Sequence, residues 1–83
     1  MESTKENNKI ILELSNEESL VLLNWLFRFN ANANENTASF EDQAEERVLW
    51  DMEAVLEKIM SETLSSDYAE LLSQARQKVR DEE

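Results

Sequence analysis

The sequence predicts a mainly α-helical fold, in which a short N-terminal strand or extended arm precedes three helices that form a small bundle. Two observations carry this prediction: apolar residues recur at helical spacing over most of the chain, and only one short segment has the composition of a strand. The 83 residues are enough for one domain, expected over residues 9–80. Residues 1–8 are polar and predicted to be disordered, and residues 81–83 are predicted to fray.

Residues 9–14, with the sequence KIILEL, predict the strand because they are short, rich in β-branched residues and partly alternating. A lone strand leaves its backbone groups without partners, and no second strand pattern is visible in the sequence. An equivalent strand from a second copy of the chain is the economical partner. The alternatives are an extended arm packed on the helices, or an extension of the first helix.

The first helix is predicted to begin after Ser15 and to end near Asn30. Ser15 and Glu18 have the spacing of a capping box, in which each residue's side chain bonds the other's backbone N–H. Apolar residues then cover most of the helix circumference, which is typical of a helix buried on more than one side. Two further helices of so short a chain can hardly cover it, so the sequence predicts an intertwined homodimer. The candidate dimer core is Leu22, Trp25, Leu26 and Phe29.

Residues 30–39 are predicted to form a loop. The chain has no Gly, and Asn30 or Asn32 is therefore expected to take the left-handed conformation that ends many helices. The second helix is predicted to run from an N-cap at Ser39 to about Leu64. The third is predicted to begin at Ser66 or Asp67. Its apolar stripe consists of Tyr68, Leu71, Leu72, Ala75 and Val79.

The second helix carries both the apolar face and the acidic cluster of the chain. A helical wheel at 100° per residue predicts a broad core arc, made of Phe40, Ala44, Val48, Leu49, Met52, Val55, Leu56, Ile59 and Met60. Trp50 lies away from this arc, among carboxylates, so it has to be covered by another part of the chain, by a second copy or by a different protein. The candidate interaction surface is therefore Glu46, Trp50, Glu53 and Glu57.

Charge and composition restrict the function classes. The net charge of −11 disfavours nucleic acid and anionic membranes as partners and is compatible with a basic protein partner. A chain without Gly, His or Cys has no phosphate-cradling glycine loop, no His-paired nucleophile, and no imidazole or thiolate ligand for a metal. The sequence thus points to no catalytic residue, cofactor or metal site. It has no apolar run long enough for a signal segment or a membrane span, and a soluble, cytoplasmic protein is expected.

These restrictions favour a non-enzymatic, acidic protein-interaction or regulatory module. One alternative is an antitoxin, an immunity protein or a nucleic-acid mimic that neutralises a basic partner. A second alternative is a carboxylate metal-binding protein, in which Glu53 and Glu57 could hold a hard cation across a dimer axis.

Three segments of the chain follow a pattern that covers most of its length: LELSNEESLVLLNWLFRFN, FEDQAEERVLWDMEAVLEK and DYAELLSQARQKV. They resemble a family of small acidic, uncharacterised bacterial proteins with the order ELS, WL and F, DQAE, VLW and LE, and then a Tyr-Leu-Leu-Ala-Arg helix. The matching positions are 13–15, 25, 26, 29, 42–45, 48–50 and 68–76. The resemblance implies no activity, cofactor or catalytic residue.

Overall fold

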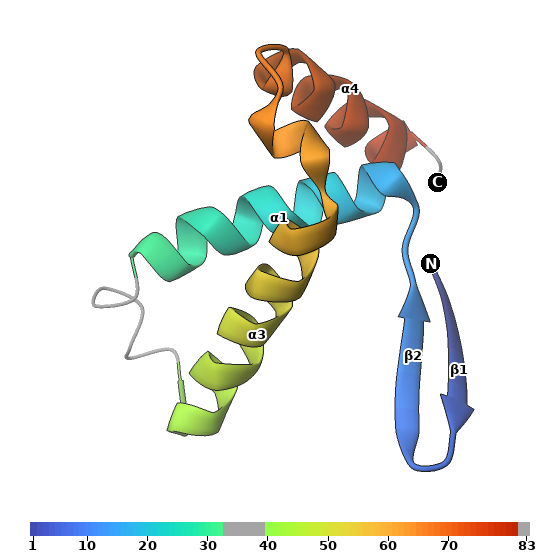
Figure 1. Ribbon diagram of the computed structural model, residues 1–83, viewed down its shortest axis with the longest axis vertical. Helices are drawn as coiled ribbons and strands as arrows, with labels where there is room; N and C mark the ends of the chain where they lie inside the picture. Colours follow the sequence, from blue (N-terminus) through green and yellow to red (C-terminus); the bar gives the residue numbers. More distant parts are fainter. Residues whose placement is uncertain (33–39, 82–83) are drawn as a thin grey trace.

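The computed structural model describes residues 1–32 and 40–81. In chain order the elements are β1 (Glu2–Glu6), β2 (Lys9–Glu13), α1 (Asn16–Ala31), α3 (Gln43–Ile59), the 3₁₀ helix η2 (Ser61–Leu64) and α4 (Tyr68–Asp81). Figure 1 shows α1 crossing between α3 and α4, while the β-hairpin extends away from the helices. The predicted helical fold, with an N-terminal β segment followed by three α-helices, is confirmed.

The N-terminus differs from the prediction, because residues 1–8 form a strand and a turn and are not disordered. β1 pairs with β2 in antiparallel register from Glu2 opposite Glu13 to Glu6 opposite Lys9. Asn7 and Asn8 connect the strands with φ of 47° and 66°. Two successive positive φ values are those of a type I′ hairpin turn, which asparagine tolerates better than most residues. The predicted strand therefore has its partner within the same chain.

α1 begins as predicted and ends at Ala31, close to the predicted end near Asn30, but its cap does not have the predicted left-handed conformation. Ser15 Oγ accepts a hydrogen bond from the Glu18 N–H at 3.0 Å, and Ser15 N–H donates to Glu18 Oε1 at 2.8 Å. At the other end Asn32 is the cap residue, but its φ of −106° is not left-handed. Its side-chain Nδ2 instead donates to the Arg28 carbonyl at 3.0 Å, which satisfies one of the last carbonyls of the helix.

α3 is shorter than predicted at its C-terminal end. Its N-cap is Asp42, whose Oδ1 accepts from the Ala44 N–H at 2.7 Å; the predicted cap Ser39 lies outside the described residues. The helix ends at Ile59 because Met60 adopts an extended backbone, with φ of −99° and ψ of 91°. This change of direction buries the Met60 side chain in the core, and η2 then leads the chain to α4.

The hydrophobic core lies where α1 meets α4 and the end of α3. Two buried residues of the predicted α4 stripe, Leu72 and Ala75, pack with the α1 leucines, so this part of the prediction is confirmed. The buried cluster consists of Leu20, Leu23, Met60, Leu72 and Ala75. The hairpin contributes no residue to this cluster, and all ten strand residues are exposed.

Candidate interaction surfaces

α3 contacts α1 through a different part of its circumference than the helical wheel predicts. Met60 is buried in the core cluster and Leu56 packs against it, while Leu49 is half-buried. Val48, Val55 and Ile59 belong to the predicted core arc but are 57%, 62% and 71% exposed. The prediction that the whole apolar arc is buried is therefore wrong, because α1 covers only one edge of it.

The predicted interaction residues Glu46, Trp50, Glu53 and Glu57 share one side of α3, since they are spaced by four, three and four positions. We call this set the acidic–aromatic face. Trp50 is 45% exposed and Glu57 is exposed, whereas Glu46 and Glu53 are half-buried. Glu53 Oε1 accepts a hydrogen bond from Asn30 Nδ2 at 3.1 Å. The acidic–aromatic face thus borders the C-terminal end of α1. The helical wheel had instead placed it on the side of α3 opposite the core.

A shallow pocket of about 350 Å³ opens beside this tryptophan. Its lining consists of Gln43, Glu46, Arg47 and Trp50. The pocket offers an indole ring, a carboxylate and an amide to an incoming group, together with one guanidinium. This combination suits a cationic side chain better than an apolar one.

The residues of the predicted dimer core lie on one side of α1 and are covered to different extents within the chain. Leu26 is completely buried within its own chain, so it has no surface that a second folded copy could contact. Trp25 stacks on Phe29 with ring centroids 4.7 Å apart, and Phe29 meets Phe40 edge-on at 5.7 Å. Leu22 is half-buried and lines the same pocket as Trp25. The four residues share one side of α1, but they differ in burial, from the completely buried Leu26 to Trp25, which is 40% exposed.

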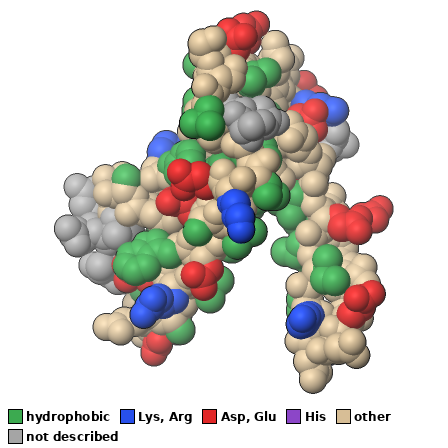
Figure 2. Space-filling view, in the orientation of Figure 1, with side chains coloured by type: hydrophobic (Ala, Val, Ile, Leu, Met, Phe, Trp, Pro, Cys, Tyr) green, Lys and Arg blue, Asp and Glu red, His purple; other side chains and the backbone are tan. Residues whose placement is uncertain are grey.

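An apolar groove, which the sequence did not reveal, lies between β2 and α3. Its volume is about 440 Å³, and Asp51 is the one charged residue of its lining. The apolar lining consists of Ile10, Leu12, Leu14, Leu22, Val48, Met52, Val55 and Leu56. Figure 2 shows a deep notch between the hairpin and the helical body, with hydrophobic side chains along its sides. We call this feature the β2–α3 groove.

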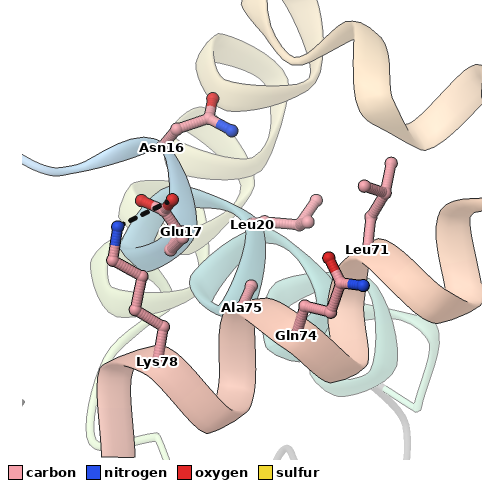
Figure 3. A pocket seen from close by; sticks show the side chains of 7 residues that line it. All are labelled: Asn16, Glu17, Leu20, Leu71, Gln74, Ala75 and Lys78. Atoms are coloured by element: carbon pink, nitrogen blue, oxygen red, sulfur yellow. Dashed lines mark hydrogen bonds and ion pairs between the residues drawn. The ribbon is translucent and has the colours of Figure 1, made fainter. Parts of the chain in front are cut away.

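A third pocket, of about 250 Å³, lies where α1 and α4 meet (Figure 3). Lys78 Nζ lies 3.2 Å from Glu17 Oε1 across its mouth, and Leu20 and Ala75 line its interior. A backbone N–H hydrogen bond and then the Lys78 ammonium lower the pKa of Glu17 below its ordinary value. Both charged groups pair with each other between α1 and α4, so we interpret this pocket as part of the contact between the two helices. We call the contact region the α1–α4 junction.

Asn24 links α1 to α4 on the side of this junction. Its Nδ2 donates to the Tyr68 hydroxyl at 3.0 Å, and its Oδ1 accepts from Arg28 Nε at 3.0 Å and from an Arg76 guanidinium nitrogen at 2.9 Å. Asn24 and Arg28 lie four residues apart, so they stand on one side of α1. The contacts of Asn24 with α4 depend on how the two helices cross, which no local pattern contains.

Among the side chains that the structure describes, no group of three acidic residues converges closely enough to hold a metal ion. Within residues 1–32 and 40–81, no helix has both the length and the apolar character that a bilayer crossing requires. No protein family model, curated protein or solved structure matches the sequence, and the resemblance to small acidic bacterial proteins therefore stays a prediction.

Proposed function

We propose that the protein is a non-enzymatic interaction module that binds a basic partner protein at the acidic–aromatic face of α3. The observation that carries this proposal is the exposure of Trp50. The residue is 45% exposed, and the charged residues Glu46 and Arg47 line the same pocket. Tryptophan is one of the residues enriched among the energetic anchors of protein interfaces.

The chemistry of the Trp50 pocket matches an arginine or lysine side chain. A cation held over the face of an indole is attracted by the ring quadrupole, and a neighbouring carboxylate adds a charge-assisted hydrogen bond. Trp50 and Glu46 line the same pocket and can supply both. Arg47 also lines it and partly offsets the negative charge, so the affinity for a cation depends on the indole as well as on the carboxylate.

The charge of the whole chain supports the same class of partner. A net charge of −11 attracts a basic surface from a distance and accelerates the encounter. Such long-range attraction is screened over about 8–10 Å at ordinary ionic strength, so binding is expected to weaken steeply with salt.

A titration with a ten-residue oligoarginine peptide tests the proposal. In the Trp25→Phe variant Trp50 is the only tryptophan, and its fluorescence should change saturably as the peptide binds. We expect affinity to fall at least tenfold between 20 mM and 500 mM salt. The affinity of the Trp50→Ala variant, measured by the fluorescence anisotropy of a labelled peptide, should be at least fivefold lower than that of the wild type at low salt.

The matched control is a carboxylate outside the acidic–aromatic face. Glu70 on α4 is exposed, and Glu70→Gln removes the same charge as Glu46→Gln. Only Glu46→Gln should weaken binding beyond the general effect of one lost charge. If the two variants bind alike and Trp50→Ala binds like the wild type, the peptide is attracted diffusely and the proposed face is incorrect.

A further inference from the structure

The folded chain is less compact than a self-sufficient domain of its size. Its radius of gyration is 14.2 Å, whereas about 12 Å is expected for 83 residues. It exposes 6571 Å², which is about 1,400 Å² more than a compact monomer of 9.7 kDa would expose. A stable interface takes roughly 800 Å² from each partner. The chain therefore has enough surplus surface to form one.

The β2–α3 groove is an apolar part of this exposed surface. Ile10 and Leu12 of β2 are 67% and 53% exposed, and Val48 and Val55 of α3 face the same space. Two-stranded hairpins that pack against nothing are marginally stable in water. The Met1 amine lies 3.4 Å from Glu18 Oε2 and holds the base of the hairpin to α1, but the apolar side chains of β2 need a further cover.

The turn geometry determines which backbone groups of β2 are available. In a two-residue hairpin the residues that flank the turn, here Glu6 and Lys9, form a hydrogen-bonded pair, and the pattern then alternates along the strand. Ile11 therefore directs its N–H and C=O toward β1, whereas Ile10 and Leu12 direct theirs toward the opposite edge. Within the described residues no strand pairs with that edge.

We propose that a second copy of this chain fills the β2–α3 groove, with the two β2 strands paired antiparallel across a two-fold axis at Ile11. This register places Ile10 opposite Leu12 of the second copy, so their available backbone groups bond each other. It also places Lys9 opposite Glu13 of the second copy, and cross-strand pairs of opposite charge are favourable. Both relations occur twice, as two-fold symmetry requires.

The same arrangement gives the exposed side of α3 a partner. The Ile10 and Leu12 side chains of each copy line the groove that Val48 and Val55 also line, so burial would be apolar against apolar. Asp51 is the sole charged residue in that lining, and the two acidic chains therefore meet at a surface with little like charge. The two acidic–aromatic faces take no part in this contact and stay available for a basic protein.

A single introduced cysteine tests the register. The chain has no Cys, and Ile11→Cys would put one thiol on the axis. Residues that face each other there form a non-hydrogen-bonded pair with Cα atoms about 4.5 Å apart, a separation that a disulfide can bridge. We expect most of this variant to become a covalent dimer under mild oxidation at 50 µM. The matched control Thr4→Cys, across the hairpin on β1, should cross-link at least tenfold more slowly.

Exchanging the charges of Lys9 and Glu13 provides a second test, which needs no covalent cross-link. Lys9→Glu would set glutamates opposite each other twice, and sedimentation equilibrium should show at least tenfold weaker dimerisation. The double variant Lys9→Glu with Glu13→Lys restores opposite charges and should recover most of the loss. Leu64→Glu changes an apolar residue that is 90% exposed outside the groove, so it should dimerise like the wild type.

Salt separates this inference from the proposed function. Screening reduces repulsion between two chains of −11, so dimerisation should strengthen with salt while oligoarginine binding weakens. A wild-type chain that sediments as a 9.7 kDa monomer at 100 µM and 150 mM salt would overturn the inference. Equal cross-linking of the two cysteine variants would overturn the register, and would point to a different dimer surface or a different occupant.

Discussion

The α1–α4 junction and the β2–α3 groove both contain aliphatic side chains, but only at the junction are such side chains buried against one another. At the junction Leu20, Leu23, Leu72 and Ala75 are buried, and polar contacts from Asn24 and Glu17 fasten the helices at its rim. In the groove Val55 stays 62% exposed, and no hydrogen bond between β2 and α3 is present among the described residues.

The difference shows that apolar composition alone does not define a core. A helix pair closes when side chains from both helices interdigitate and the polar groups at the margin find partners. The hairpin and α3 stand too far apart for this, and they leave space that a polypeptide segment can occupy. The junction therefore contains the buried core of the described chain, and the groove is the surface at which we propose that a second copy binds.

The largest expected loss of stability follows from a substitution at the α1–α4 junction. Leu23 is fully buried, so Leu23→Ala should lower the free energy of unfolding by about 3 kcal/mol through lost burial and the cavity left behind. Urea denaturation at a concentration where the chain is monomeric measures this loss. Val55→Ala is the matched substitution in the groove and should cost less than about 0.5 kcal/mol there. Equal losses would remove the distinction between the two regions.

A smaller effect is expected at the start of α1, where the hairpin joins the helices. Ser15→Ala removes the hydroxyl that accepts the Glu18 N–H and should cost about 1 kcal/mol. Ser65→Ala is the control, because Ser65 Oγ accepts a single hydrogen bond from the Asp67 N–H and does not take part in a capping box. Thermal unfolding followed by circular dichroism should give a clearly lower Tm for Ser15→Ala than for Ser65→Ala. A similar Tm for both variants would mean that the capping box is unimportant for the junction.

The smallest expected effect is the pH dependence of the same end of α1. Hydrogen bonding to the Ser15 N–H, and then the Met1 amine, lower the pKa of Glu18. A carboxylate with a lowered pKa stabilises the fold above its ordinary value of about 4.3, and this contribution is lost as the pH falls through the folded-state pKa. Glu18→Gln should therefore be less stable than the wild type at pH 6, and the difference should shrink by pH 3. If the difference in stability between Glu18→Gln and the wild type does not change with pH, the loss comes from packing and not from the charge of Glu18.

Local patterns predicted the parts of the fold that local contacts determine. Ser15 and Glu18 lie three residues apart, so they can form the capping box whatever the orientation of the helix in the fold. The buried residues of the α4 stripe, Leu72 and Ala75, pack with the α1 leucines. The Asn7–Asn8 turn was also local, since two adjacent asparagines favour a type I′ turn, but β1 has no apolar residue to mark it as a strand.

The candidate sites required information that the sequence does not contain. The wheel gives the width of the apolar arc of α3 but not the part that α1 covers, which depends on the crossing of two helices. Glu53 was therefore expected in solvent and instead bonds Asn30, while Val48 was expected in the core and is exposed. The groove depends on β2 and α3, which are separated by thirty residues or more, and on a hairpin that the prediction omitted.

The polar composition of β1 has a consequence for how far such a sheet can grow. Its sequence ESTKE has no hydrophobic side chain, and charged residues, lysine above all, discourage a further strand from adding to an outer edge. Strand addition is thus favoured at β2 and opposed at β1. A chain that exposes Ile10, Ile11 and Leu12 in succession would otherwise be a template for amyloid-like stacking. In the proposed dimer both outer strands of the sheet would be β1, so the sheet would end at four strands and would not extend into a fibril.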